Sequence, residues 1–173
     1  MTNNKTVKLY NVLLPIWLLI FVPSFLWLVL IPLNYLIDRI VLKWSLKDMD
    51  EKGAFCRKHN WKICIAGFVS DFIGVLFLFG TYIALSDIDQ RSPVRKAIGN
   101  VVYGLGFDPF SNVLALVIIV LAIAIAGACI YFVDKRILAK AGLDTAQAKN
   151  SALKLALITA PYLFLIPSSI LYR

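Results

Sequence analysis

The chain has 173 residues, 60% of them hydrophobic, and its mean hydropathy is +0.79. Soluble globular domains contain roughly 45–50% apolar residues, so this composition argues against a typical soluble domain. The net charge is +8, but the charged residues, 16% of the chain, gather between long apolar runs. Basic loops beside membrane segments explain that charge, and we therefore expect no nucleic-acid partner.

Four apolar runs are long enough for membrane helices, because about 20 helical residues cross a hydrocarbon core of about 30 Å. None of them shows the period-2 alternation of a half-buried strand. The sequence therefore predicts an all-α polytopic membrane protein: one integral membrane domain, residues 1–173, with a bundle of four transmembrane helices. These spans cover about residues 9–31, 63–85, 110–133 and 155–171.

The segment after Pro32 changes character, because apolar residues recur at helical spacing with polar residues between them. Pro32 suits the first turn of a new helix, and the pair Lys43 and Trp44 suits a membrane interface. We expect a short amphipathic interfacial helix over about residues 33–46. The alternative is a plain continuation of the first helix beyond the bilayer.

The third and fourth runs are predicted to form a tight helical hairpin. Nothing breaks the third helix beyond Val133 until Gly142, a residue type that commonly follows a helix end. Asp144 then offers a side chain that can cap the fourth helix. Pro161 and Pro167 introduce a kink into that last helix.

Basic residues are distributed unevenly between the loops. Twelve of the 18 Lys and Arg lie between runs one and two or between runs three and four, and six lie elsewhere. We expect the protein to lie in the cell membrane, and the positive-inside rule predicts both termini on the non-cytoplasmic side.

Asp71 is the strongest candidate for a functional residue. It lies eight residues after Ile63, about 12 Å along a helix, where an ionisable group is costly and usually faces a partner or a water-filled cavity. Small residues nearby would let another helix approach closely, so we expect Asp71 to face the bundle. Two hypotheses remain open: a proton- or cation-binding carboxylate, or a structural hydrogen bond. The structural partners considered are Asn34, Thr159, Ser168 and Ser169.

Asn34 and Asp38 form a second candidate cluster, because a spacing of four places them on one helix face. Both are expected within reach of Lys62, either as an ordinary interfacial network or as part of an ion- or substrate-binding site. Cys56, His59 and Cys64 lack a fourth ligand at a zinc-site spacing, so we expect no metal and no other cofactor.

The sequence contains no catalytic signature such as H-E-x-x-H, G-x-S-x-G or a P-loop. We therefore expect a non-enzymatic protein that acts as a subunit or accessory partner of a membrane complex, or as a homo-oligomer. The alternative function is a small transporter or channel in which Asp71 binds a proton or a cation.

Overall fold

The computed structural model describes residues 15–20, 27–46, 49–87 and 94–170. In this part of the chain 87% of the residues are helical and none forms a strand, which confirms the all-α prediction. The α-helices are α1 (Trp27–Ser45), α2 (Lys52–Ser86), α3 (Arg95–Gly106), α4 (Val113–Lys140) and α5 (Thr145–Thr159). Four short 3-10 helices are η1 (Ile16–Ile20), η2 (Pro109–Ser111), η3 (Tyr162–Leu165) and η4 (Ser168–Ile170).

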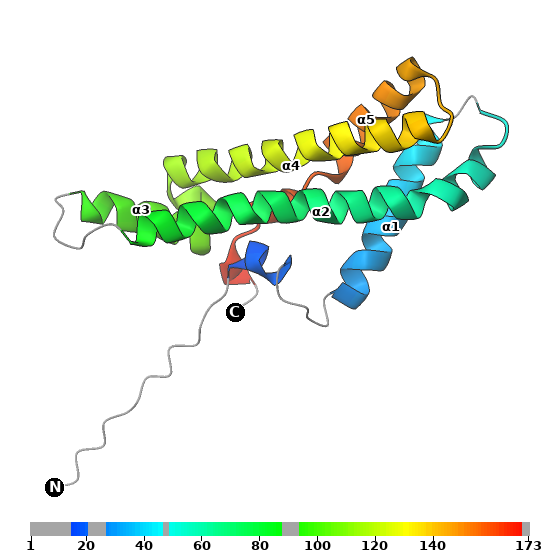
Figure 1. Ribbon diagram of the computed structural model, residues 1–173. Coiled ribbons are helices and arrows are strands. Elements are labelled where there is room, and N and C mark those ends of the chain that lie inside the picture. Colours follow the sequence, from blue (N-terminus) through cyan, green and yellow to red (C-terminus); the bar gives the residue numbers. More distant parts are fainter. Residues whose placement is uncertain (1–14, 21–26, 47–48, 88–93, 171–173) are drawn as a thin grey trace, which may run out of the picture.

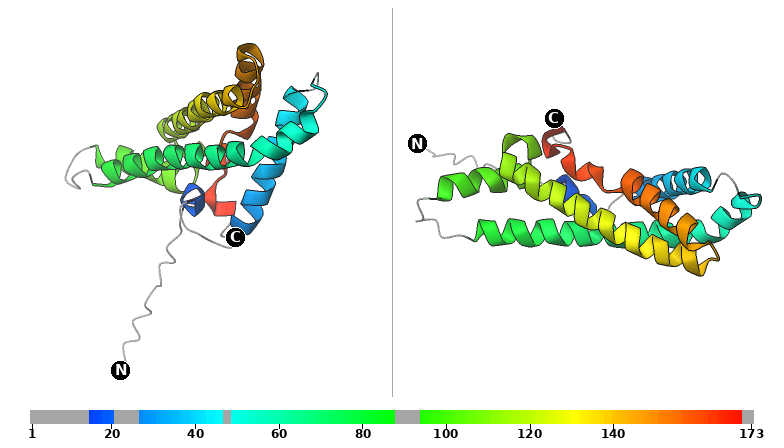
Figure 2. Two further views of the ribbon diagram at one scale, coloured as in Figure 1. Left: turned by 45° about the vertical axis from the view of Figure 1, so that its right-hand side comes forward. Right: turned by 90° about the horizontal axis from the view of Figure 1, so that it is seen from above.

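The long helices α2 and α4 lie side by side and run antiparallel (Figures 1 and 2). They come close together at Gly74, where an added Cβ atom would lie 3.1 Å from the carbonyl oxygen of Ala122 and 3.2 Å from Ala126 Cβ. Ser70 and Ala66, one and two turns earlier on α2, are buried as well. These small residues, Ala66, Ser70 and Gly74, therefore permit the close helix contact that the sequence predicts.

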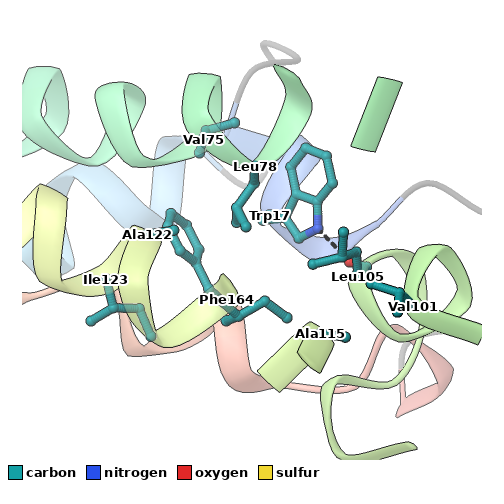
Figure 3. Packing of buried hydrophobic residues seen from close by; sticks show 10 residues of the cluster. Trp17, Val75, Leu78, Val101, Leu105, Ala115, Ala122, Ile123 and Phe164 are labelled. Carbon is teal, nitrogen blue, oxygen red and sulfur yellow. Dashed lines mark hydrogen bonds between the residues drawn. The ribbon is translucent and has the colours of Figure 1, made fainter. Parts of the chain in front are cut away.

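Two hydrophobic clusters form the core, one near each end of the α2–α4 pair. Figure 3 shows the first, in which Trp17 of η1 packs with Val75 and Leu78 of α2, Ala122 of α4 and Phe164 of η3. Its indole N–H donates a hydrogen bond to the carbonyl oxygen of Leu105, 2.8 Å away. The second cluster joins α1, the N-terminal part of α2, and the α4–α5 hairpin.

The α4–α5 hairpin has the geometry expected from its sequence. Gly142 adopts a φ of +101°, its N–H bonds to Ala139, and the N–H of Leu143 bonds to Leu138. These two bonds define a Schellman motif, in which a glycine ends the helix. The carboxylate of Asp144 then accepts from the backbone N–H groups of residues 146 and 147 and caps α5.

Gly142→Ala is expected to lower the free energy of unfolding by about 1–2 kcal/mol, because side chains are strained at positive φ. Gly53→Ala is the matched control, since nothing lies within 4 Å of the added methyl group in α2. Unfolding of both variants in detergent micelles measures the difference. Equal stability of the two variants would contradict the importance of this turn.

The predicted separation of a first span from an interfacial helix is wrong within the described residues. Instead, α1 begins at Trp27 and continues through Pro32 to Ser45 without a break, as the alternative interpretation holds. The proline is tolerated because it lies in the second turn on an exposed face, where few backbone bonds are lost. Upstream, residues 16–20 form a 3-10 helix, and the remainder of the predicted span, 9–14 and 21–26, lies outside the described residues.

The predicted helix over residues 155–171 is also wrong. Helix α5 covers residues 145–159 and ends before Pro161, which forces Ala160 into an extended conformation. The chain then passes through η3 and η4 and returns toward the C-terminal end of α3 (Figure 1). There Ser168 accepts from the N–H of Ile16 and donates to the carbonyl oxygen of Gly106, so the irregular backbone is hydrogen-bonded inside the protein.

Within the described part of the chain, two helices are long and apolar enough to cross a membrane. They are α2 and α4, whose most hydrophobic stretches have mean hydropathies of 2.2 and 3.2. The predicted spans at 63–85 and 110–133 lie almost entirely within them. Length and composition therefore support two of the four predicted spans.

Candidate functional site

Asp71 lines a groove of about 460 Å³ that is bordered by α1, α2 and the broken connection between α5 and η3. Asn34 of α1 lines the same groove, as do Thr159 and Tyr162 on its third side. The other nine lining residues are apolar. Two of the three predicted site residues are thus brought together, although 37 positions separate them in the sequence.

The carboxyl group of Asp71 is largely buried and incompletely satisfied. The residue is 7% exposed, and its Oδ1 atom has no hydrogen-bond partner among the described residues. Two predicted structural partners use their hydroxyl protons elsewhere: Thr159 donates to the carbonyl oxygen of Leu155, and Ser168 donates to Gly106. Asp71 therefore faces the bundle as predicted, but the hydrogen bonds that would make it a structural residue are not formed with these two hydroxyl groups.

The end of α5 adds partial negative charge to the groove. A helix C-terminus leaves its last carbonyl groups without intrahelical partners and carries the negative end of the helix dipole. Ile158, Thr159 and Ala160, which line the groove, belong to this end of the helix. The Tyr162 hydroxyl donates to the carbonyl oxygen of Leu157 at 2.5 Å, which satisfies one of the exposed carbonyl groups. A carboxyl group and a helix C-terminus thus border one half-open space.

Asp38 is buried beside this site but does not line the groove. It is 5% exposed, and its charge acts on the carboxyl groups of both Asp71 and Asp134. The predicted contact with Lys62 is wrong, because Lys62 is exposed and its Nζ atom lies 5.7 Å from the ring centroid of Trp61. Since no basic side chain pairs with Asp38 in the described part of the chain, burial raises its pKa to about 7.

Asp134 is the buried acidic residue that sequence reasoning missed. It is 1% exposed, and neither carboxyl oxygen has a hydrogen-bond partner among the described residues. Its neighbours Lys135 and Arg136 suggest a solvated helix surface, but the helix turns those two side chains away from the protein interior. A spacing of four from Ile130 and from Leu138, both buried, is the signal that identifies the buried face.

The three buried carboxyl groups belong to three different helices, Asp38 to α1, Asp71 to α2 and Asp134 to α4. Among the described residues, no three His, Cys, Asp or Glu side chains come close enough to hold a metal ion. The three buried acidic residues therefore do not form a metal-binding cluster. Only Asp71 among them opens onto the groove.

The raised pKa of Asp38 predicts a pH-dependent stability. The folded state binds the Asp38 proton more tightly than the unfolded chain, so this contribution is complete below pH 4 and is lost as the pH rises toward 7. Each pH unit in that window costs up to about 1.4 kcal/mol. Asp38→Asn should reduce the pH dependence of the unfolding free energy measured in micelles from pH 4 to 7. If the unfolding free energy of the variant depended on pH as strongly as that of the wild type, Asp38 would not be a buried, unpaired carboxyl group.

In the part of the chain that the structure describes, the fold is all-α, with two membrane-length helices and a carboxyl group in a half-open groove. Comparison of the chain with known protein families, with curated proteins and with solved structures gave no match.

Proposed function

We propose that this chain is a non-enzymatic, multi-pass integral membrane protein of the cell membrane. The support is the large apolar surface of α2 and α4. Only 33% of the most hydrophobic stretch of α4 is buried within the protein. The α4 residues Val113, Leu121 and Phe132 are each at least half exposed. Soluble monomers rarely expose apolar patches larger than a few hundred Å², whereas a bilayer covers such surfaces.

The function that the site supports best is the binding of a proton or a cation by Asp71, as in a small transporter or channel. One observation carries this proposal: the buried and incompletely bonded Asp71 carboxyl group lies in the wall of a groove beside a broken helix. In membrane proteins an ionisable residue at depth marks an ion or substrate pathway by default. Irregular backbone at that depth is tolerated where it is buried or lines a cavity, and broken helices commonly border ion sites.

Flux through proteoliposomes that contain only the purified chain tests this function. A pH-sensitive dye in the lumen reports proton movement, and radiolabelled sodium or rubidium reports cation movement, each under an imposed gradient. Flux above that of protein-free vesicles is expected. Vesicles that contain the folded chain and show no flux of either kind would contradict a transport function.

A second candidate function is an accessory subunit of a membrane complex or a homo-oligomer. It is favoured by an apolar groove of about 320 Å³ between α4 and α5, where Ala124, Gly127 and Ala128 leave space for a close helix contact. Small residues in membrane helices permit such contacts. Disulfide cross-linking of an Ala124→Cys variant in membranes would distinguish a second copy from a different partner by the mass of the product.

We propose that the end of the bundle formed by the α1–α2 and α4–α5 connections faces the cytoplasm. Basic residues gather there, and three of their amino groups lie over aromatic rings, as is common at a membrane interface. The closest pair is Lys154 and Trp44, with 4.7 Å between Nζ and the ring centroid. The other two pairs are Lys62 with Trp61 and Lys135 with Tyr131.

Single-cysteine labelling tests this orientation, in a background without the three native cysteines. Lys58 lies near the N-terminal end of α2, and Lys96 lies near the N-terminal end of α3, which follows the C-terminal end of α2. Both side chains are exposed. An impermeant maleimide should label Lys96→Cys on intact cells but label Lys58→Cys only after the cells are opened. The reverse pattern would show that the proposed orientation, with both ends of the chain outside, is inverted.

A further inference from the structure

The groove beside Asp71 has fewer oxygen ligands than protein sites for metal cations usually have. Protein sites for such ions surround them with several oxygen ligands, either carboxylates or rings of carbonyl groups. Here one carboxyl group, one side-chain amide and two hydroxyl groups share the walls with nine apolar residues. The volume of about 460 Å³ lies within the range of about 300–1,000 Å³ that is typical of sites for organic ligands.

We propose that the groove binds a hydrophobic organic cation. This inference rests on the proposed function, in which Asp71 binds a cation, and adds the chemical class of the ligand. The positive group lies against the Asp71 carboxylate, and the apolar body of the ligand contacts Leu33, Phe68 and Leu163. Phe68 and Tyr162 add aromatic rings to the wall, which attract a cation when it is removed from water.

The charges around the groove exclude the other classes of organic ligand. Among the described residues no lysine or arginine lines it, and the Asp38 carboxyl group acts on Asp71 from α1. An anion would therefore face acidic groups and the negative end of α5 without a compensating charge. A neutral apolar molecule, such as a lipid chain, would leave the buried Asp71 carboxyl group without a partner, which is costly.

Access to the groove agrees with a ligand that partitions into the bilayer. The groove is half open, and exposed apolar residues border it, including Leu33 on α1 and Ile158 on α5. A hydrophobic cation dissolved in the membrane would reach Asp71 from the side, between α1 and the broken end of α5. A strongly hydrated ion gains nothing from such apolar walls.

Two ions of the same shape and opposite charge test the inference. Tetraphenylphosphonium is a hydrophobic cation, and tetraphenylborate is its anionic counterpart. Equilibrium dialysis of each ion against the full-length chain in detergent, corrected for protein-free micelles, measures saturable binding. Three variants accompany the wild type: Asp71→Asn removes the charge, Asp71→Glu retains it, and Asp134→Asn makes the same change at a buried carboxyl group outside the groove.

Saturable binding of tetraphenylphosphonium but not tetraphenylborate is expected for the wild type. Asp71→Asn should weaken it at least about tenfold, whereas Asp71→Glu and Asp134→Asn should stay within about threefold of the wild type. Equal binding of both ions, undiminished binding by Asp71→Asn, or no saturable binding would overturn the inference. If inorganic cation or proton flux still depended on Asp71, the proposed function would stand while the organic ligand would be excluded.

Discussion

Asp71→Asn is expected to reduce proton or cation flux through proteoliposomes to the level of protein-free vesicles. The amide keeps the shape of the carboxyl group but can neither release a proton nor neutralise a cation. Asp71→Leu should abolish flux equally, because both variants remove the one carboxyl group that the described residues contribute to the groove wall. Each variant changes one side chain of the groove and leaves the rest of the site in place. Detergent should therefore still extract both variants from the membrane as folded protein.

Asp134→Asn is the matched control for this prediction. Asp134 is at least as deeply buried as Asp71, and neither of its carboxyl oxygens has a hydrogen-bond partner in the described part of the chain, yet it does not line the groove. Its variant should retain flux. If Asp71→Asn transports normally and only Asp71→Leu loses stability, by about 0.6–2 kcal/mol, then Asp71 serves as a structural hydrogen-bonding residue and the transport hypothesis fails.

Gly74→Leu is expected to lower the free energy of unfolding by about 1–3 kcal/mol or more, because the side chain would enter a closely packed contact. Even its Cβ atom would lie 3.1 Å from the carbonyl oxygen of Ala122 and 3.2 Å from both Ala126 and Phe164. The leucine would push α2 away from α4 and from the C-terminal segment at the same time. Unfolding in mixed micelles, followed by circular dichroism, measures the loss.

Gly80→Leu controls for the introduction of leucine into the same helix. Gly80 lies beyond Gly74 on α2, and nothing comes within 4 Å of its added Cβ atom. Its stability should match the wild type within about 0.5 kcal/mol, as for other exposed substitutions. Comparable losses in both variants would show that the close α2–α4 contact at Gly74 does not stabilise the fold.

The parts of the fold that the sequence predicts correctly have local causes. Uninterrupted apolar runs produce α2 and α4, and Gly142 with Asp144 produces the turn between α4 and α5. The errors concern prolines. Pro32 stays inside α1 because the surrounding helix compensates for one lost bond, whereas Pro161 ends α5 because the following chain finds partners in α3 and η1. Those partners are more than 60 residues away, beyond the reach of a local pattern.

The residues of the candidate site likewise divide into those that a local sequence pattern identifies and those that depend on the fold. Asp71 stands out in the sequence because it interrupts an apolar run, and Asn34 follows from helical spacing. Asp134 was missed because its basic neighbours disguise a buried position, and Lys62 was wrongly assigned because helix rotation turns it outward. The groove itself depends on the end of α5 at Ala160, so its existence could not be inferred before the break in that helix was known.

Infrared difference spectroscopy of the purified chain tests most directly whether Asp71 is the group that exchanges a proton for a cation. Spectra recorded with and without tetraphenylphosphonium, at a fixed pH, report carboxyl groups whose protonation changes on binding. The wild type and Asp134→Asn should show the loss of a protonated carboxyl band and the gain of a carboxylate band, and Asp71→Asn should show neither. The same difference spectrum in Asp71→Asn would contradict the assignment of the site to Asp71.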